Sequence, residues 1–307
     1  MTASRLRTAR SATAVGVIAI FLWSCLALLT TLTEGIPPFE LLTLSFGVAF
    51  AASLITLGRH GMSGFSSWRQ PWAVWATGFV GIFVYHALYF FALKVAPAAE
   101  ASLINYLWPL MLVLLSAFAA GEKLHKRQVL GAVLGLAGTA FIMQQRATHT
   151  AATMPVAGYL AAFGCALIWA GYSVFNRRFS AVPSSIIGGI CGMSAVAGLV
   201  CHLAFETTVW PDLNQWAAIV VLGLGPAGLA FFAWDHATKH GNLATLGALS
   251  YLAPLISTLL LIVVGHGHGH ASPILIVPAL LIIAGAVIAT AQAPEKAPAT
   301  RSMVSHE

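Results

Sequence analysis

The sequence is poor in charge, and this scarcity excludes most classes of soluble protein. Charged residues make up 8% of the 307 residues, against about 25% in a typical soluble domain. The basic residues are scattered singly through short segments, so the sequence pI of 9.4 does not indicate a nucleic-acid partner. The four cysteines lie inside apolar runs without a Cys-x-x-Cys pair, which argues against a disulfide framework or a metal cluster.

The residues of intramembrane catalysis are also missing. The sequence has no His-Glu-x-x-His motif and no Gly-Asp dipeptide, and Asp235 is the one acid that falls clearly within an apolar run. We therefore predict that the protein is not an enzyme and holds no metal and no cofactor. The first apolar run, residues 13–33, contains no acid, which disfavours a cation–proton antiporter of the small multidrug type. The absence of mid-run cations disfavours nucleotide sugars as cargo.

Long apolar runs dominate what is present. Hydrophobic residues make up 59% of the chain, and the mean hydropathy is +0.85. A transmembrane helix needs about 20 apolar residues, and the N-terminal run is too long for a signal peptide and is followed by no cleavage site. We predict an all-α membrane protein with ten transmembrane helices, at residues 13–33, 38–58, 72–95, 100–120, 127–145, 155–176, 184–206, 214–238, 243–264 and 273–292.

The basic residues predict the orientation of these spans. With a cytoplasmic N-terminus, thirteen of the fifteen Lys and Arg residues fall on the inner side, and only Lys94 and Arg146 fall outside. Such a bias is the positive-inside pattern. Both termini are therefore predicted to be cytoplasmic, with tails at residues 1–12 and 293–307.

The sequence also repeats itself. A shift of 145 residues places Tyr106 on Tyr251 and Pro109 on Pro254, which divides the chain into halves at residues 13–145 and 155–292. Each half has five spans, and an odd number makes the second half enter the membrane from the opposite side. Inverted repeats of this kind are typical of secondary transporters, whose substrate site lies near the bilayer midplane.

The stretch ASLINYLWPLMLVLLSAFAAGEKLHKRQVLGAVLGLAGTAFI (101–142) resembles the end of an EamA repeat of the drug/metabolite transporter superfamily. Trp23 and Trp169, in the first span of each half, fit the same resemblance. It implies a ten-helix transporter, and the aromatic central helices look most like those of the YddG-type aromatic amino acid exporters of bacterial inner membranes. One departure is that GHGHGHA (265–271) replaces the Gly-Glu turn at Glu122 in the second half.

Several aromatic and polar side chains lie deep within the predicted spans, where polar groups need partners or a wet cavity. They predict an aromatic-lined central cavity that takes contributions from both halves; ordinary helix packing is the alternative for each residue. The candidate substrate-binding residues are Trp23, Tyr85, His86, Tyr89, Asn105, Tyr106, Trp108, Trp169, Tyr172, Trp234, Ser250 and Tyr251.

Two prolines are predicted to kink the helices beside this cavity. Pro109 and Pro254 lack an N–H, so each leaves the carbonyl four residues earlier, at Asn105 or Ser250, without its helical donor. Freed groups are tolerated in a membrane where they line a cavity or find partners. We therefore expect the two kinks to act in gating and to face each other across the pseudo-twofold axis, although a simple packing kink remains the alternative.

Two groups are candidates for proton coupling. His86 is either a proton carrier or a neutral hydrogen-bonding group in the cavity wall. Asp235 is either a proton carrier or the partner of Lys239, which follows it by one helical turn in the favourable acid-before-base order.

These observations predict a multi-pass exporter of the bacterial inner membrane that moves aromatic and neutral amino acids by alternating access. The shortage of embedded acids favours facilitated export, with proton coupling as the second choice. A broad exporter of drugs or quaternary ammonium compounds is the alternative, because aromatic cages attract cations. The expected partners are the lipid bilayer and a small-molecule substrate, without nucleic acid, and a monomer is favoured.

Overall fold

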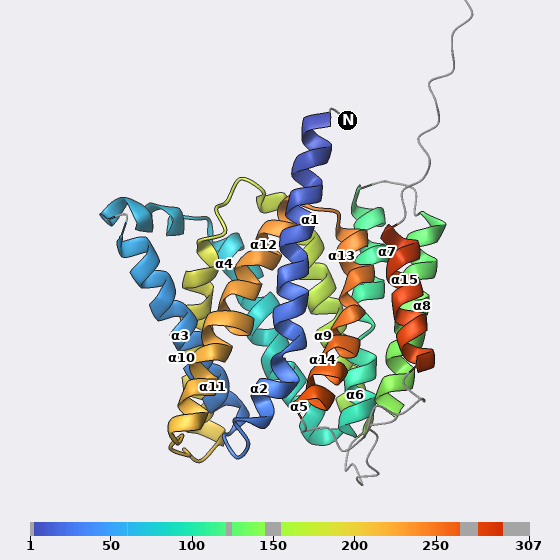
Figure 1. Ribbon diagram of the computed structural model, residues 1–307. Coiled ribbons are helices and arrows are strands. Elements are labelled where there is room, and N and C mark those ends of the chain that lie inside the picture. Colours follow the sequence, from blue (N-terminus) through green and yellow to red (C-terminus); the bar gives the residue numbers. More distant parts are fainter. Residues whose placement is uncertain (1–2, 60, 121–124, 145–154, 265–275, 291–307) are drawn as a thin grey trace, which may run out of the picture.

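The computed structural model describes residues 3–59, 61–120, 125–144, 155–264 and 276–290, and every regular element within these ranges is a helix. The helices stand side by side as a bundle, and α1 (Ala3–Ser24) projects beyond it at the end that carries the N-terminus (Figure 1). The predicted all-α class is therefore confirmed. The expected tail at residues 1–12 is helical from Ala3, because Ala, Leu and Arg are strong helix formers.

In both halves of the chain, several spans are built from consecutive helices. The first half contains α1, α2 (Leu26–Thr31), α3 (Pro38–Gly58), the 3-10 helix η1 (Gly61–Trp68), α4 (Trp72–Phe79), the π-helix η2 (Val80–Val84), α5 (Tyr85–Val95), α6 (Ala98–Asn105), α7 (Trp108–Ala120) and α8 (Lys126–Gln144). The second half contains α9 (Pro155–Phe175), the 3-10 helix η3 (Asn176–Phe179), α10 (Ile186–Phe205), α11 (Leu213–Leu224), the π-helix η4 (Gly225–Leu229), α12 (Ala230–His240), α13 (Leu243–Ser250), α14 (Leu252–Val263) and α15 (Ile276–Thr290).

Local sequence explains where several of these helices begin. Pro38 is the first residue of α3, a position at which its missing N–H costs no hydrogen bond. Asp212 accepts hydrogen bonds from the backbone of Asn214 and Gln215, and the Gln215 side chain accepts one from the Asp212 backbone in return. This capping box fixes the start of α11.

Eight spans in the described chain are long and apolar enough to cross a membrane, and they coincide with eight of the ten predicted runs. The other two predicted runs, 127–145 and 273–292, correspond to α8 and α15. α8 starts with two cations and a glutamine, and the described part of α15 has 15 residues, so neither reaches the same length and apolarity. A multi-pass membrane protein is thus confirmed, and the count of ten spans stays a prediction.

Helices at equivalent positions of the two halves pack against each other in opposite directions. Gly188 of α10 lies beside Ser53 near the end of α3, whereas Gly198 lies beside Leu42 near its start. A Cβ on Gly188 would fall 1.7 Å from Ser53 Oγ, so this glycine allows the two helices to touch. α8 and α15 pair in the same antiparallel manner.

Two irregularities recur in the backbone at a separation of 145 residues. η2 and η4 each insert one π-turn between two α-helices, and they begin 145 residues apart. The spans also break after α6 and after α13, at Tyr106 and Tyr251, so that Pro109 and Pro254 lie in the first turn of the following helix. The Tyr251 hydroxyl donates to the backbone carbonyl of Tyr106 at 3.2 Å. The two breaks are therefore in direct contact.

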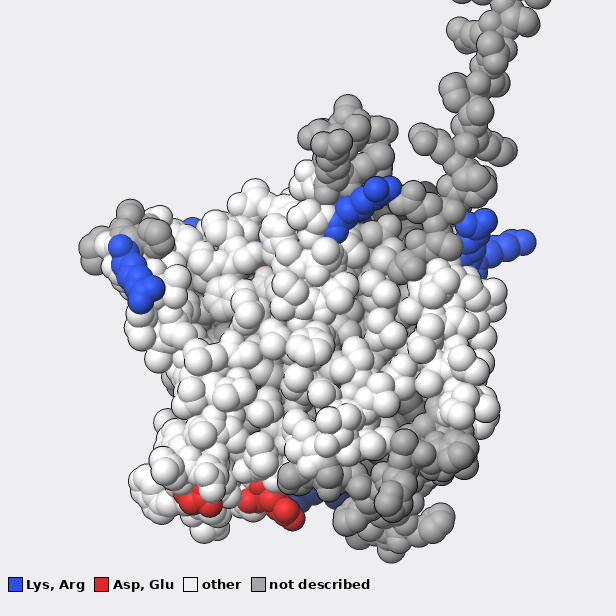
Figure 2. All heavy atoms as spheres, viewed as in Figure 1, with Lys and Arg blue, Asp and Glu red and all other residues white. Residues whose placement is uncertain are grey.

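Charged side chains lie at the two ends of the bundle and leave its middle apolar. On the face drawn in Figure 2, most Lys and Arg side chains lie at the end where α1 begins, and acidic side chains lie at the opposite end beside one smaller basic patch. This separation agrees with the charge pattern of the sequence. The GHGHGHA segment, Glu122 and the C-terminal tail lie outside the described residues.

Candidate functional site

Four tryptophans from four different helices meet at the centre of the bundle. Trp23 of α1 lies 5.5 Å from Trp169 of α9 and 5.3 Å from Trp234 of α12, measured between ring centroids. Trp108 of α7 lies 6.2 Å from Trp169 and 5.7 Å from Trp234. Trp169, Trp234 and Trp108 are buried, in agreement with their deep positions in the spans. The sequence placed all four among the candidate residues, and the structure brings them together.

Hydrogen bonds hold two of these rings in place. Trp23 Nε1 donates to the carbonyl of Pro226, which lies in the π-turn η4, at 3.1 Å. Trp234 Nε1 donates to Ser173 Oγ at 3.0 Å, and Ser173 in turn donates to the carbonyl of Trp169. Because a buried indole N–H is costly without an acceptor, these bonds fix the orientation of both rings.

Two phenylalanines complete the cluster, and the sequence interpretation did not include them. Phe231 lies within 6.2 Å of Trp23, Trp169 and His86, and Phe46 of α3 lies 5.6 Å from His86. Phe231 could have been found, because the 145-residue shift places it on His86. Phe46 has no such signal, since apolar residues are frequent throughout α3.

A polar wall adjoins the cluster on the side of α5 and α6. The Tyr85 ring lies 5.6 Å from that of Trp169, and its hydroxyl accepts a hydrogen bond from Asn105 Nδ2 at 2.9 Å. Tyr89 and Ser102 share a hydrogen bond of 2.9 Å. Asn105 is 5% exposed, and its Oδ1 has no hydrogen-bond partner among the described residues. This acceptor is therefore buried and has its hydrogen-bonding capacity unused within the described chain.

The remaining candidate residues are distributed unevenly. Tyr172 is buried and its ring lies 5.4 Å from Trp169, so it belongs to the cluster. Tyr251 is fully buried in a second hydrophobic cluster with Val113 and Ile282. The Ser250 hydroxyl donates to the carbonyl of Leu246 in its own helix. Within the described chain, Tyr251 therefore makes no ring contact with the tryptophans, and the Ser250 hydroxyl is bonded within its own helix. The carbonyl of Tyr106 accepts the hydrogen bond of Tyr251 at the break.

The two candidates for proton coupling differ in their surroundings. His86 Nδ1 lies 2.6 Å from the carbonyl of Ile82, and its ring packs between Phe46 and Phe231. Asp235 lies 2.8 Å from Lys239 Nζ, and both side chains are almost completely buried. The ion pair predicted from their spacing is therefore present, and Asn176 donates to the same carboxylate.

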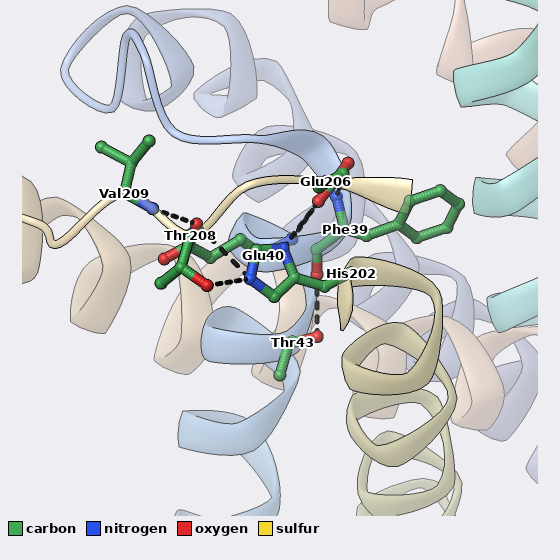
Figure 3. A network of polar contacts seen from close by, with 7 residues as sticks. All are labelled: Phe39, Glu40, Thr43, His202, Glu206, Thr208 and Val209. Carbon is green, nitrogen blue, oxygen red and sulfur yellow. Dashed lines mark hydrogen bonds and ion pairs between the residues drawn. The ribbon is translucent and has the colours of Figure 1, made fainter. Parts of the chain in front are cut away.

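The sequence interpretation missed a second polar site, which lies at the acidic end of the bundle (Figure 3). Glu40 at the start of α3 and His202 near the end of α10 are buried within apolar spans, 6% and 4% exposed. His202 Nδ1 lies 2.9 Å from Glu206 Oε2, and its Nε2 lies 3.9 Å from Glu40 Oε2. Asp235 is thus not the one acid inside a span, because the antiparallel contact of α3 and α10 buries Glu40.

Long apolar helices around a buried aromatic cluster define the class of this protein as a multi-pass membrane protein with a candidate binding site at its centre. Two stretches, residues 10–144 and 156–291, match the family model of the EamA-like transporters. The chain belongs to the EamA-like transporter family. The resemblance inferred from residues 101–142 is thereby confirmed.

Curated relatives with a named activity agree with this membership. The chain is 48% identical to the aromatic amino acid exporter YddG of Ancylobacter novellus over 281 residues, which cover 91% of this chain and 97% of the relative. It is 26% identical to the aromatic amino acid exporter YddG of Escherichia coli, over 82% of this chain and 88% of the relative. A protein solved by crystallography has 47% identity and a TM-score of 0.85, over 92% of this chain and 96% of the solved one.

Proposed function

We propose that this protein exports aromatic and neutral amino acids across the bacterial inner membrane, and that the central aromatic cluster is its substrate site. The proposal is supported by the exporter activity named for its relatives and by the four tryptophans that meet at the centre of the bundle. Each contact between a substrate ring and one of these rings would contribute about 0.5–1.5 kcal/mol beyond the burial of area. The monomer is taken as the working unit.

The transport cycle proposed here is alternating access between two inverted five-helix halves, residues 13–145 and 155–292, with both termini in the cytoplasm. The antiparallel pairing of α3 with α10 supports it, as does the recurrence of π-turns and breaks at 145 residues. The basic end of the bundle, where α1 begins, is then the cytoplasmic end.

The two halves contribute different chemistry to the proposed site. The first half supplies Tyr85, His86 and Asn105, and the positions equivalent to them in the second half are Ala230, Phe231 and Ser250. At these three positions the first half is therefore the more polar, while both halves supply tryptophans to the cluster. We propose that the clustered aromatic rings hold the substrate ring and that Asn105 Oδ1, buried without a partner, accepts a hydrogen bond from the substrate ammonium.

Facilitated export is favoured over coupling through Asp235. Its carboxylate already has Lys239 and Asn176 as partners, so a transported proton would have to displace an ion pair. His86 remains the second candidate for proton coupling, because imidazole changes charge near physiological pH. Export of quaternary ammonium compounds is the alternative function, since the faces of the clustered indoles would also attract a cation.

Uptake into proteoliposomes tests the proposal. Purified protein is reconstituted, and the uptake of labelled phenylalanine, tryptophan and a quaternary ammonium dye is measured with and without a proton gradient. We expect amino acid flux without a gradient. The absence of any amino acid flux, with dye flux present, would replace the main proposal by the alternative.

The variant Asn105→Leu tests the proposed ammonium contact, with Asn214→Leu on the exposed start of α11 as the control. Loss of a hydrogen bond to a charged group costs about 1.5–3 kcal/mol, which raises KM roughly 10- to 150-fold. The control should transport normally. An unchanged KM for Asn105→Leu at normal expression would remove this residue from the site.

A further inference from the structure

The second polar site consists of three titratable residues at the acidic end of the bundle: Glu40, His202 and Glu206. Within the described chain, no Lys or Arg forms an ion pair with any of them. Other described charged groups near this end are Glu34 before α3, Asp212, which caps α11, and the exposed Lys94 and Glu100 at the junction of α5 and α6. In the part of the chain that the structure describes, no ion pair or hydrogen bond joins any of them to the trio. The imidazole of His202 is therefore the group of the trio that can compensate the negative charge of the two carboxylates.

The hydrogen bonds around His202 indicate which of its two ring nitrogens carries a fixed proton. The backbone N–H groups of Phe39 and Glu40 donate to the two oxygens of Glu206, at 3.0 and 3.1 Å. An oxygen pair that accepts from the start of a helix is held as a carboxylate. Because this carboxylate has no proton to give, His202 Nδ1 must donate to it across the 2.9 Å contact. The other nitrogen, Nε2, is then the atom that gains or loses a proton.

The neighbours of Nε2 can interact favourably with both the neutral and the protonated imidazole. Thr208 Oγ1 lies 2.9 Å away, and a hydroxyl donates to a neutral nitrogen or accepts from a protonated one. Glu40 Oε2 lies 3.9 Å away and accepts a hydrogen bond from the backbone N–H of Val209. Thr207 and Thr208 belong to the exposed segment that follows α10, so the medium is close to the site.

We propose that His202 Nε2 binds a proton from the medium on the outer side of the membrane, and that this proton fastens the start of α3 to the end of α10. The proposal rests on the orientation and export activity proposed above. With the ring neutral, the two carboxylates of the trio have no positive charge between them, and two of the three side chains are buried. With the ring protonated, both carboxylates attract it, and the contact between α3 and α10 becomes tighter.

The site is connected to the aromatic cluster through α3. The Phe39 ring points away from the polar network in Figure 3 and lies 5.4 Å from the ring of Phe90 on α5. Phe90 in turn lies 6.2 Å from His86, and Phe46 of α3 also packs on His86. A proton that holds the start of α3 against the end of α10 therefore keeps the outer side of the substrate site closed. External acid is expected to slow the release of substrate.

The main experiment measures phenylalanine export from oriented proteoliposomes at constant internal pH, with the external pH varied between about 5 and 8, where histidine changes charge. The wild-type rate should fall several-fold as the outside becomes acidic. The variant His202→Gln keeps hydrogen-bonding groups but cannot take up this proton, and its rate should be nearly constant. The control is His236→Gln, which alters an exposed histidine at the opposite end of the bundle.

A second variant covers the case in which His202→Gln folds poorly. Glu40→Gln retains an acceptor for the Val209 N–H and removes one of the two negative charges. The proton should then bind less tightly, and the pH midpoint of export should move to more acidic values. A midpoint that is unchanged in Glu40→Gln, or a wild-type pH profile in His202→Gln, would overturn the proposal.

Thermal unfolding of the purified protein supplies a readout that does not depend on transport. The difference in Tm between wild type and His202→Gln should be largest at acidic pH and shrink as the pH rises, since the bound proton stabilises the folded helix contact. If the wild type moves no phenylalanine but this Tm difference is present, the proposed export fails and the proton site stands. If phenylalanine is exported but neither readout depends on His202, the proton site fails and the export stands.

Discussion

Replacement of Lys239 by methionine is expected to destabilise the protein severely. Methionine fills a similar volume, but it leaves Asp235 buried, at 1% exposure, without its cation. The donor Asn176 remains, yet one amide does not compensate a full charge in an apolar interior. Removal of one partner of a buried ion pair costs about 3–5 kcal/mol. For a large helical domain this corresponds to a decrease in Tm of roughly 6–10 °C.

The double variant Asp235→Leu/Lys239→Met separates the charge from the packing. Apolar replacement of both partners is often neutral or stabilising, so the double variant should regain most of the lost Tm. Tm is measured by tryptophan fluorescence in detergent for the wild type, both single variants and the double variant. A double substitution at the exposed positions Leu213 and Asn214 serves as the control, and it should leave Tm unchanged.

Two results would contradict this reasoning. A Lys239→Met variant as stable as the wild type would mean that Asp235 does not carry a buried charge. A double variant that is stable but has lost gradient-dependent transport would return Asp235 to the role of proton carrier. The measurement therefore decides between the two interpretations of this acid.

Two further predictions concern helix contacts. In Gly188→Ala the new Cβ would lie 1.7 Å from Ser53 Oγ, so α3 and α10 must separate, at a cost of about 1–3 kcal/mol. Gly47→Ala on the same α3 helix is the control, because its new Cβ meets nothing within 4 Å and should stabilise the folded protein by about 0.5–1 kcal/mol. Equal Tm changes in the two variants would refute the close contact of α3 with α10. In Tyr251→Phe the hydrogen bond to Tyr106 is lost, and we expect a decrease of about 0.5–1.5 kcal/mol in unfolding free energy, read as a lower Tm; no decrease would show that the bond contributes nothing.

The central cluster was predictable because it follows from two simple regularities. Deep aromatic residues in apolar spans are unusual, and the repeat shift shows which of them are equivalent. Trp23 and Trp169 are such a pair when the shift is lengthened by one residue, and they meet at 5.5 Å. Depth in the spans and the repeat therefore identified the tryptophans of α1, α7, α9 and α12 as candidates, and the structure shows that they meet.

The second polar site, at the acidic end of the bundle, was not predictable from the same patterns. Glu40 and Glu206 lie at the ends of predicted spans, where a charge usually faces water, and they are 166 residues apart. Their joint burial depends on the register in which α3 packs on α10, which three hydrogen bonds and several glycines determine. A sequence pattern carries no information about that register.

The placement of Ser250 and Tyr251 shows where the repeat is imperfect. In the first half, two residues separate α6 from α7, whereas in the second half Tyr251 alone separates α13 from α14. The number of residues from the tyrosine to the proline is nevertheless the same in both halves, so the neighbouring helices make the difference. Tyr251 packs against Gly135 of α8, where a Cβ would lie 2.6 Å from its ring, whereas the equivalent position in the second half is Leu280.

The hydrogen bond from Tyr251 to the carbonyl of Tyr106 has a consequence for the proposed transport cycle. It joins two equivalent residues, yet only one of them is the donor, so the bond itself is asymmetric. When two inverted halves exchange conformations, each contact is replaced by its counterpart. The opposite-facing state should therefore contain the reciprocal bond, in which the hydroxyl of Tyr106 donates to the carbonyl of Tyr251, and the direction of this one bond would report which side of the membrane the protein faces.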